Sequence, residues 1–83
     1  MKPEQLNWVV LAFDKATEKH VGTYALPQCD MEAFCQAMGK PSGDPLHNSL
    51  PIPKQGAAYF ERLLGRVFDF QSQIYFLEGQ RPD

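Results

Sequence analysis

The sequence has few cysteines and no long hydrophobic run, and both absences exclude classes of protein. Its two cysteines, Cys29 and Cys35, cannot form the disulfide framework of a small secreted domain. A membrane-spanning helix needs about 20 apolar residues in a row, whereas the longest apolar run in the first half of the chain covers residues 8–13. The polar start of the chain lacks the pattern of a signal peptide. We therefore expect a cytoplasmic protein that does not contact membranes.

A strong excess of either charge is also missing. Eight basic residues stand against ten acidic ones, which gives a formal net charge of -2. Nucleic-acid binding draws most of its affinity from a basic patch, so this balance disfavours a nucleic-acid partner. A small nucleic-acid binder stays open only as a minor alternative, because aromatic side chains on an open sheet can stack on bases.

Residue types for catalysis or metal binding are few and scattered. Nucleophilic catalysis needs a nucleophile and a base within hydrogen-bond reach. The only candidates are Cys29 or Cys35 with His20 or His47, and their spacing brings none of them together. No pair of histidines, cysteines or acids has the spacing of a metal site. We expect no enzymatic activity, no cofactor and no metal.

The sequence does contain the material for one small hydrophobic core. Its 83 residues are 43% hydrophobic and 12% aromatic, which suits a single domain and argues against disorder. A domain of this size buries only about 60% of the surface of its unfolded chain. A bound partner or second copy would therefore add usefully to a small margin of stability.

Two strands are predicted in the first third of the chain. Residues 8–13, Trp-Val-Val-Leu-Ala-Phe, favour the extended conformation and carry no charge, so we expect a central strand covered on both faces. Residues 14–19 are short and polar, as in a hairpin loop. Residues 20–26 predict an antiparallel edge strand, in which Gly22 marks a bulge or a close approach of another group.

Two helices follow. Residues 31–38 have a capping residue before them in Asp30 and a left-handed terminator after them in Gly39. The expected buried face consists of Met31, Phe34, Cys35 and Met38. Residues 55–64 predict the second helix, which ends at Gly65. Its expected buried face consists of Ala57, Phe60, Leu63 and Leu64.

The connection between the helices, residues 40–54, is unusually long and contains four prolines. Neither helix nor sheet tolerates that density of proline, and structureless connections of this length are often binding loops. Leu46, Leu50 and Ile52 would hold the loop against the body of the domain. After the second helix, residues 66–70 predict a short extended segment and residues 74–78 a last strand.

These elements predict an α+β domain of order ββααβ, spanning residues 1–83. The last strand should return beside the first, which gives a three-stranded antiparallel sheet of order 2-1-3 with both helices on one face. Two short helices cannot cover both faces of such a sheet. Either the long loop folds over the second face, or that face meets another chain.

Two pairs of carboxylates are candidate contact residues. Asp14 and Glu18 flank the predicted hairpin, and Asp30 and Glu32 open the first helix. If the hairpin and the helix start lie at one edge, the four form an acidic patch that would steer a basic partner. The alternative is that they are solvated ends and caps.

The long loop supplies further candidates. Asp44, His47 and Asn48 offer adaptable polar contacts, and the prolines lower the entropy lost on binding. Tyr59 and Tyr75 are the aromatic residues that we expect at an interface. The alternatives are a purely structural crossover and partly buried tyrosines of the fold.

Three stretches resemble a loose group of small bacterial immunity proteins from toxin systems such as contact-dependent inhibition. They are Val-Leu-Ala-Phe-Asp-Lys-Ala-Thr-Glu-Lys at residues 10–19, Tyr-Phe-Glu-Arg-Leu-Leu-Gly at residues 59–65, and Asp69 with Tyr-Phe-Leu-Glu at residues 75–78. The resemblance implies a non-enzymatic protein that binds and neutralises a toxin domain. It carries over no binding residue. The alternative is an accessory module that forms a homodimer through its sheet face or its edge strand.

Overall fold

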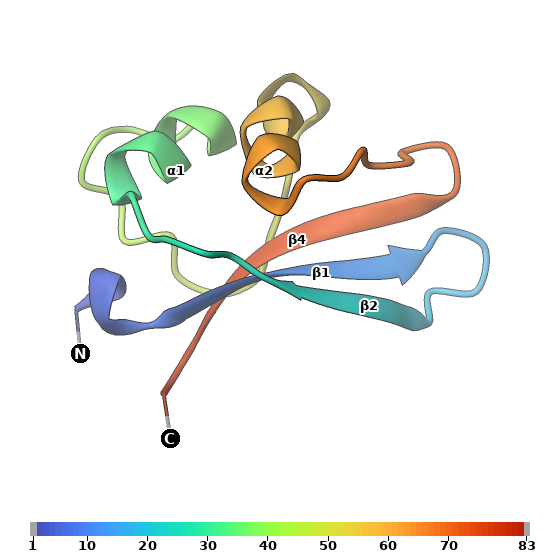
Figure 1. Cartoon of the computed structure of the whole chain (residues 1–83), viewed down its shortest axis with the longest axis horizontal. Coiled ribbons are helices and arrows are strands. Elements are labelled where there is room, and N and C mark those ends of the chain that lie inside the picture. Colours follow the sequence, from blue (N-terminus) through green and yellow to red (C-terminus); the bar gives the residue numbers. More distant parts are fainter. Residues whose placement is uncertain (1, 83) are drawn as a thin grey trace.

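A computed structural model describes residues 2–82, and in this range the chain forms a four-stranded antiparallel sheet with two α-helices on one face (Figure 1). The strands run in the order β2-β1-β4-β3. The elements in chain order are a 3-10 turn η1 (Pro3–Gln5), β1 (Asn7–Asp14), β2 (His20–Ala25), α1 (Met31–Met38), β3 (Leu50–Pro51), a 3-10 turn η2 (Lys54–Gly56), α2 (Ala57–Leu64) and β4 (Gln73–Gln80). No helix within this range is long and apolar enough to cross a membrane.

The α+β class and the predicted place of the last strand are confirmed, because β4 pairs with β1 on the side opposite β2. The prediction of three strands was wrong, because the proline-rich loop contributes β3 at the outer edge of β4. The Ile52 amide donates to the Tyr75 carbonyl at 2.8 Å. Amides alternate in direction along a strand, so the nitrogen of Pro51 points away from β4 and its missing hydrogen costs no bond in the sheet.

The core lies between the sheet and the helices. From β1, Trp8, Val10 and Ala12 are buried against this core. The largest completely buried side chains elsewhere in it are Phe34 of α1, Phe60 of α2, Leu46 of the loop and Leu77 of β4. The prediction that β1 is central is therefore confirmed. The expectation that both its faces are covered was wrong in part, because Leu11 and Phe13 on the other face are only half-buried.

The predicted bulge is present in β2. Ala12 pairs with Gly22, but the next residue of β1, Phe13, pairs with His20, so Val21 is an extra residue. Gly22 also meets a close neighbour. A side chain there would begin 2.7 Å from the hydroxyl oxygen of Tyr24. Both reasons proposed for a glycine at this position are thus found in the structure.

Both helices end at the residues that the sequence indicates. The Asp30 carboxylate accepts a hydrogen bond from the Ala33 amide at 3.2 Å, and Gly39 ends α1 with φ of 69°. Gly65 ends α2 with φ of 66°. The start of α2 differs from the prediction, because residues 54–56 form a 3-10 turn. Here Gly56 packs directly on α1: an added Cβ would lie 1.6 Å from the Ala37 carbonyl oxygen.

Candidate contact surface on the open face of the sheet

The helices leave one face of the sheet uncovered (Figure 1). Side chains alternate along a strand, so the residues between the core positions of β1 and β4 point to this side. We call it the open face. The residues that form it are Val9, Leu11 and Phe13 of β1, Ile74, Phe76 and Glu78 of β4, His20, Thr23 and Ala25 of β2, and Pro51 of β3.

An aromatic pair lies at the centre of the open face. The ring centroids of Phe13 and Phe76 are 5.5 Å apart in an edge-to-face arrangement, and the His20 ring lies 5.4 Å from Phe13. The register places Ile74 directly opposite Phe13. These apolar side chains are only half-buried although they pack on one another. The strands therefore hold an ordered apolar surface in contact with water.

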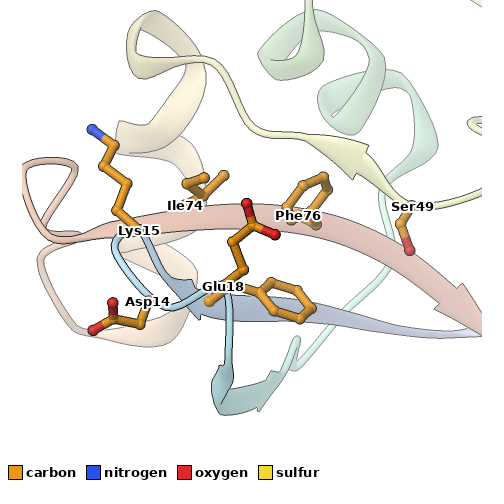
Figure 2. Close-up of a pocket in the computed structure, with 7 residues that line it drawn as sticks. Asp14, Lys15, Glu18, Ser49, Ile74 and Phe76 are labelled. Carbon is orange, nitrogen blue, oxygen red and sulfur yellow. The ribbon is translucent and has the colours of Figure 1, made fainter.

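A hollow of about 340 Å³ opens over this pair (Figure 2). The residues that line it are Phe13, Asp14, Lys15, Glu18, Ser49, Ile74 and Phe76. Figure 2 shows Glu18 reaching from the hairpin loop towards Phe76, whereas Lys15 points away from it. The Lys15 ammonium donates to the Phe70 carbonyl at 2.5 Å. The hollow thus combines apolar walls with a carboxylate at its rim.

Hydrogen bonds favour the ionised form of two further carboxylates in this region. The amides of Thr17 and Ala16 donate to Asp14 at 3.0 and 2.8 Å and lower the pKa of that carboxyl. The hydroxyl of Ser49 donates to Glu78 at 2.5 Å and, with a weaker contribution from Gln80, lowers the Glu78 pKa. The open face is therefore apolar at its centre and has carboxylates towards both ends.

The four predicted acidic residues do not form one patch. His20 pairs with Phe13 beside the hairpin, and Ala25 pairs with Val9 at the other end of the sheet. Because β2 runs the length of the sheet before α1 begins, the helix start lies opposite the hairpin (Figure 1). Asp14 and Glu18 therefore lie at one end, while Asp30 caps α1 and Glu32 occupies its first turn at the other end.

The loop candidates also lie apart from the hollow. The Asp44 carboxylate accepts from the Leu46 amide at 2.8 Å, and the Asp44 carbonyl accepts from the Cys35 thiol at 3.3 Å, so Asp44 orders the loop. His47 and Asn48 are exposed and line a smaller hollow of about 90 Å³ at another place. Two loop residues do reach the open face: Ser49 lines the hollow, and Pro51 pairs with Phe76.

The two tyrosines lie on the helix side of the sheet, Tyr75 in β4 and Tyr59 in α2. Tyr75 is only 4% exposed, and its ring stacks on Phe68 at 4.1 Å, so its side chain offers little surface to a partner. Tyr59 is half-buried with its ring 6.0 Å from Phe34 and 5.3 Å from Phe60. Burial, aided by the charge of Asp30, raises the Tyr59 pKa. The exposed part of Tyr59 leaves its prediction as an interface residue open.

Sequence reasoning missed the apolar lining of the hollow, namely Phe13, Ile74 and Phe76. The signal that could have found them is alternation. If the core face of β1 is fixed by Trp8 and Val10, the remaining residues of that strand must point the other way. In β4, alternation alone does not tell whether Tyr75 or Phe76 faces the core. That assignment needs the register between β1 and β4.

The residue types that carry catalysis stay dispersed. Cys35 is buried in the core and Cys29 is exposed near the start of α1. His20 lies on β2, with its Nε2 2.8 Å from the Thr23 hydroxyl, whereas His47 belongs to the loop. Among the side chains that the structure describes, histidines, cysteines and acids form no group of three or more that could hold a metal ion.

One family model covers most of the chain. It is described as a domain of unknown function, DUF7683, and it matches residues 7–78, which include every strand-forming residue of the hollow. No curated protein matches the sequence. The extent of the match shows that the chain belongs to the DUF7683 family.

Proposed function

We propose that this protein is a protein-binding module that contacts its partner through the open face of the sheet. The observation that carries the proposal is the hollow over Phe13, Ile74 and Phe76. Aromatic side chains held in fixed positions lose little conformational entropy on binding, and such residues dominate the binding energy of protein interfaces. Covering them would remove apolar area from water at about 25 cal/mol per Å².

The charges around the hollow favour a partner with a basic group. Asp14 and Glu18 lie at one end of the open face and Glu78 towards the other, whereas the Lys15 ammonium is bound to the Phe70 carbonyl. A lysine or arginine from the partner could lay its hydrocarbon stem on Phe76 and place its charge beside Glu18. Such complementarity increases the association rate and disfavours acidic partners.

The resemblance to bacterial immunity proteins supports a more specific form of the proposal, in which the partner is a toxin domain. An immunity protein acts by contact, so the residues of the open face would cover or distort the toxin and would not take part in a reaction. The gene for the partner is then expected beside the gene for this protein, as a toxin-like open reading frame directly upstream.

Co-expression with the product of that neighbouring frame tests the proposal. We expect a stoichiometric complex in size-exclusion chromatography, which Phe76→Ser weakens and Val67→Ser leaves intact. Val67 is a suitable control because it is 85% exposed and lies outside the open face. Near-ultraviolet circular dichroism establishes that both variants are folded.

Two results would contradict the proposal. A complex that is equally tight with Phe76→Ser would place the contact elsewhere. A wild-type chain that dimerises at micromolar concentration and loses this association in Phe76→Ser would show that the open face binds a second copy, which is the alternative that the sequence left open.

A further inference from the structure

The two edges of the sheet differ in their capacity to pair with another strand. At one edge β3 has only two residues, and Pro51 has no amide hydrogen to offer. Short edge strands and outward prolines prevent edge-to-edge pairing. At the other edge β2 has six residues, His-Val-Gly-Thr-Tyr-Ala, with no proline, lysine or acid. The protein thus protects one edge and leaves the other accessible.

The direction of the backbone groups in β2 follows from its bond to β1. The Leu26 amide donates to the Trp8 carbonyl at 2.9 Å, which continues the β1–β2 pairing by one residue. Because neighbouring residues alternate in direction, the amides and carbonyls of Thr23 and Ala25 point away from β1. Both residues are exposed. Their amides and carbonyls can therefore form hydrogen bonds with an added antiparallel or parallel strand.

A positive charge lies beside this edge on the helix side of the sheet. The guanidinium carbon of Arg66 is 4.1 Å from the centroid of the Tyr24 ring. Tyr24 pairs with Val10, a core residue, so the stacked pair lies on the side that the helices cover. Arg66 is exposed, and its guanidinium forms no ion pair with any carboxylate that the structure describes. Stacking on the ring holds its donors in place near the edge.

We propose that β2 binds an extended segment of a partner protein as an added strand, and that this segment carries a carboxylate on its helix-side face for Arg66. The ladder would form with Thr23 and Ala25, beyond the bulge at Val21 that interrupts regular pairing. Main-chain bonds would provide the affinity and the carboxylate the specificity. The ladder uses the outward backbone groups of Thr23 and Ala25, whereas the proposed contact on the open face centres on the hollow, which no residue of β2 lines. Each proposal can therefore fail without the other.

The charge argument also selects this occupant over a second copy of the chain. In a symmetric pair, β2 of one molecule would lie against β2 of the other. Since β2 contains no aspartate or glutamate, the added strand would bring no carboxylate from its own residues to Arg66. A strand from another protein is under no such restriction.

Amide hydrogen exchange with a model peptide tests the proposal. The probe is a blocked peptide of alternating valine and glutamate, which presents all its carboxylates on one face. At a peptide concentration about ten times Kd, exchange at Thr23 and Ala25 should slow about tenfold, because only the free protein exchanges. Exchange at Tyr24, whose amide already faces β1, should stay unchanged. A matched peptide of valine and lysine should have no effect.

Three variants separate the contributions. Arg66→Gln should raise Kd by about fivefold to tenfold, because it removes a charge-assisted bond. Arg62→Gln is the control, since Arg62 is an exposed arginine on α2. Thr23→Pro removes an outward amide hydrogen from β2, as Pro51 does in β3. It should abolish peptide binding while the Tyr24 amide stays protected from exchange.

Three outcomes would overturn the proposal. The first is unchanged exchange at Thr23 and Ala25 with millimolar peptide, and the second is equal protection by the lysine peptide. The third is protection that rises with protein concentration alone, which would identify a second copy as the occupant.

Discussion

Replacing Glu18 by glycine should stabilise the protein while it weakens partner binding. Glu18 lies in the hairpin loop with φ of 61°, a left-handed conformation that side chains with a Cβ rarely adopt. Its amide donates to the Asp14 carbonyl at 2.7 Å, and glycine would keep this bond. The side chain has a different role, because it brings a carboxylate to the rim of the hollow.

The size of the effect follows from two opposing terms. The left-handed conformation costs a residue with a Cβ about 1–2 kcal/mol. Glycine removes this cost but loses more conformational freedom on folding, by about 0.5–1 kcal/mol. The net gain for Glu18→Gly is about 0.5–1 kcal/mol, which corresponds to about 3–6 °C in Tm for a domain of this length.

Thermal unfolding followed by circular dichroism measures the shift, with Ala16→Gly as the matched control. Ala16 belongs to the same loop but not to the residues with positive φ, so glycine there should lower Tm. The two variants are thus expected to shift Tm in opposite directions. If Glu18→Gly lowers Tm as Ala16→Gly does, the left-handed conformation does not strain the loop and the reasoning is refuted.

Three further predictions concern the packing of the interior and the loss of stability at low pH. Gly56→Ala should cost more than about 2 kcal/mol in urea unfolding, because the new Cβ would overlap the Ala37 carbonyl oxygen at 1.6 Å; an unchanged midpoint would show that the two segments separate at little cost. Phe34→Ala should cost about 3–5 kcal/mol, since this ring is completely buried, and a smaller loss would show that the core collapses around the cavity. The folded-state pKa values of Asp14 and Glu78 lie below their ordinary values of 3.8 and 4.5. Their contribution to the free energy of unfolding is therefore present above pH of about 4.5 and is lost as the pH falls through the lowered values. Asp14→Asn should make the free energy of unfolding fall less steeply with pH in this acidic range. An equally steep fall would contradict the assignment to Asp14.

The sequence predicted best those elements whose signals are local. For α1, the cap Asp30, the periodic apolar face and the terminator Gly39 all lie within ten consecutive residues, and the helix has the expected bounds. The β1–β2 hairpin was predicted for the same reason, since a short polar loop joins two runs of residues with β preference.

The sequence did not predict those features that depend on register between distant strands. Proline density in residues 40–54 suggested that no strand could form, but Pro51 is compatible with β3 because its nitrogen points out of the sheet. In the same way, the pairing of Leu11 with Phe76 decides that Phe76 faces solvent and Tyr75 the core. The hollow joins side chains from three separate segments, so no local pattern could show it.

The position of the acidic residues is a further example. Each pair was recognised correctly as flanking a hairpin or opening a helix. Whether the two pairs lie at the same end of the sheet depends on the path of β2. This strand begins beside Phe13 and ends beside Val9, at the other end of the sheet, before α1 begins. The spacing of the acidic residues in the sequence does not show which end of the sheet each pair occupies.

Photo-crosslinking in the native host tests the role of the open face most directly. Phe76→p-benzoylphenylalanine places a reactive group in the hollow, and Val67→p-benzoylphenylalanine places the same group outside it. We predict one protein of another sequence joined at the first position and absent at the second. Crosslinks at Val67 alone, crosslinks only to a second copy, or no crosslinked protein at either position would contradict the account.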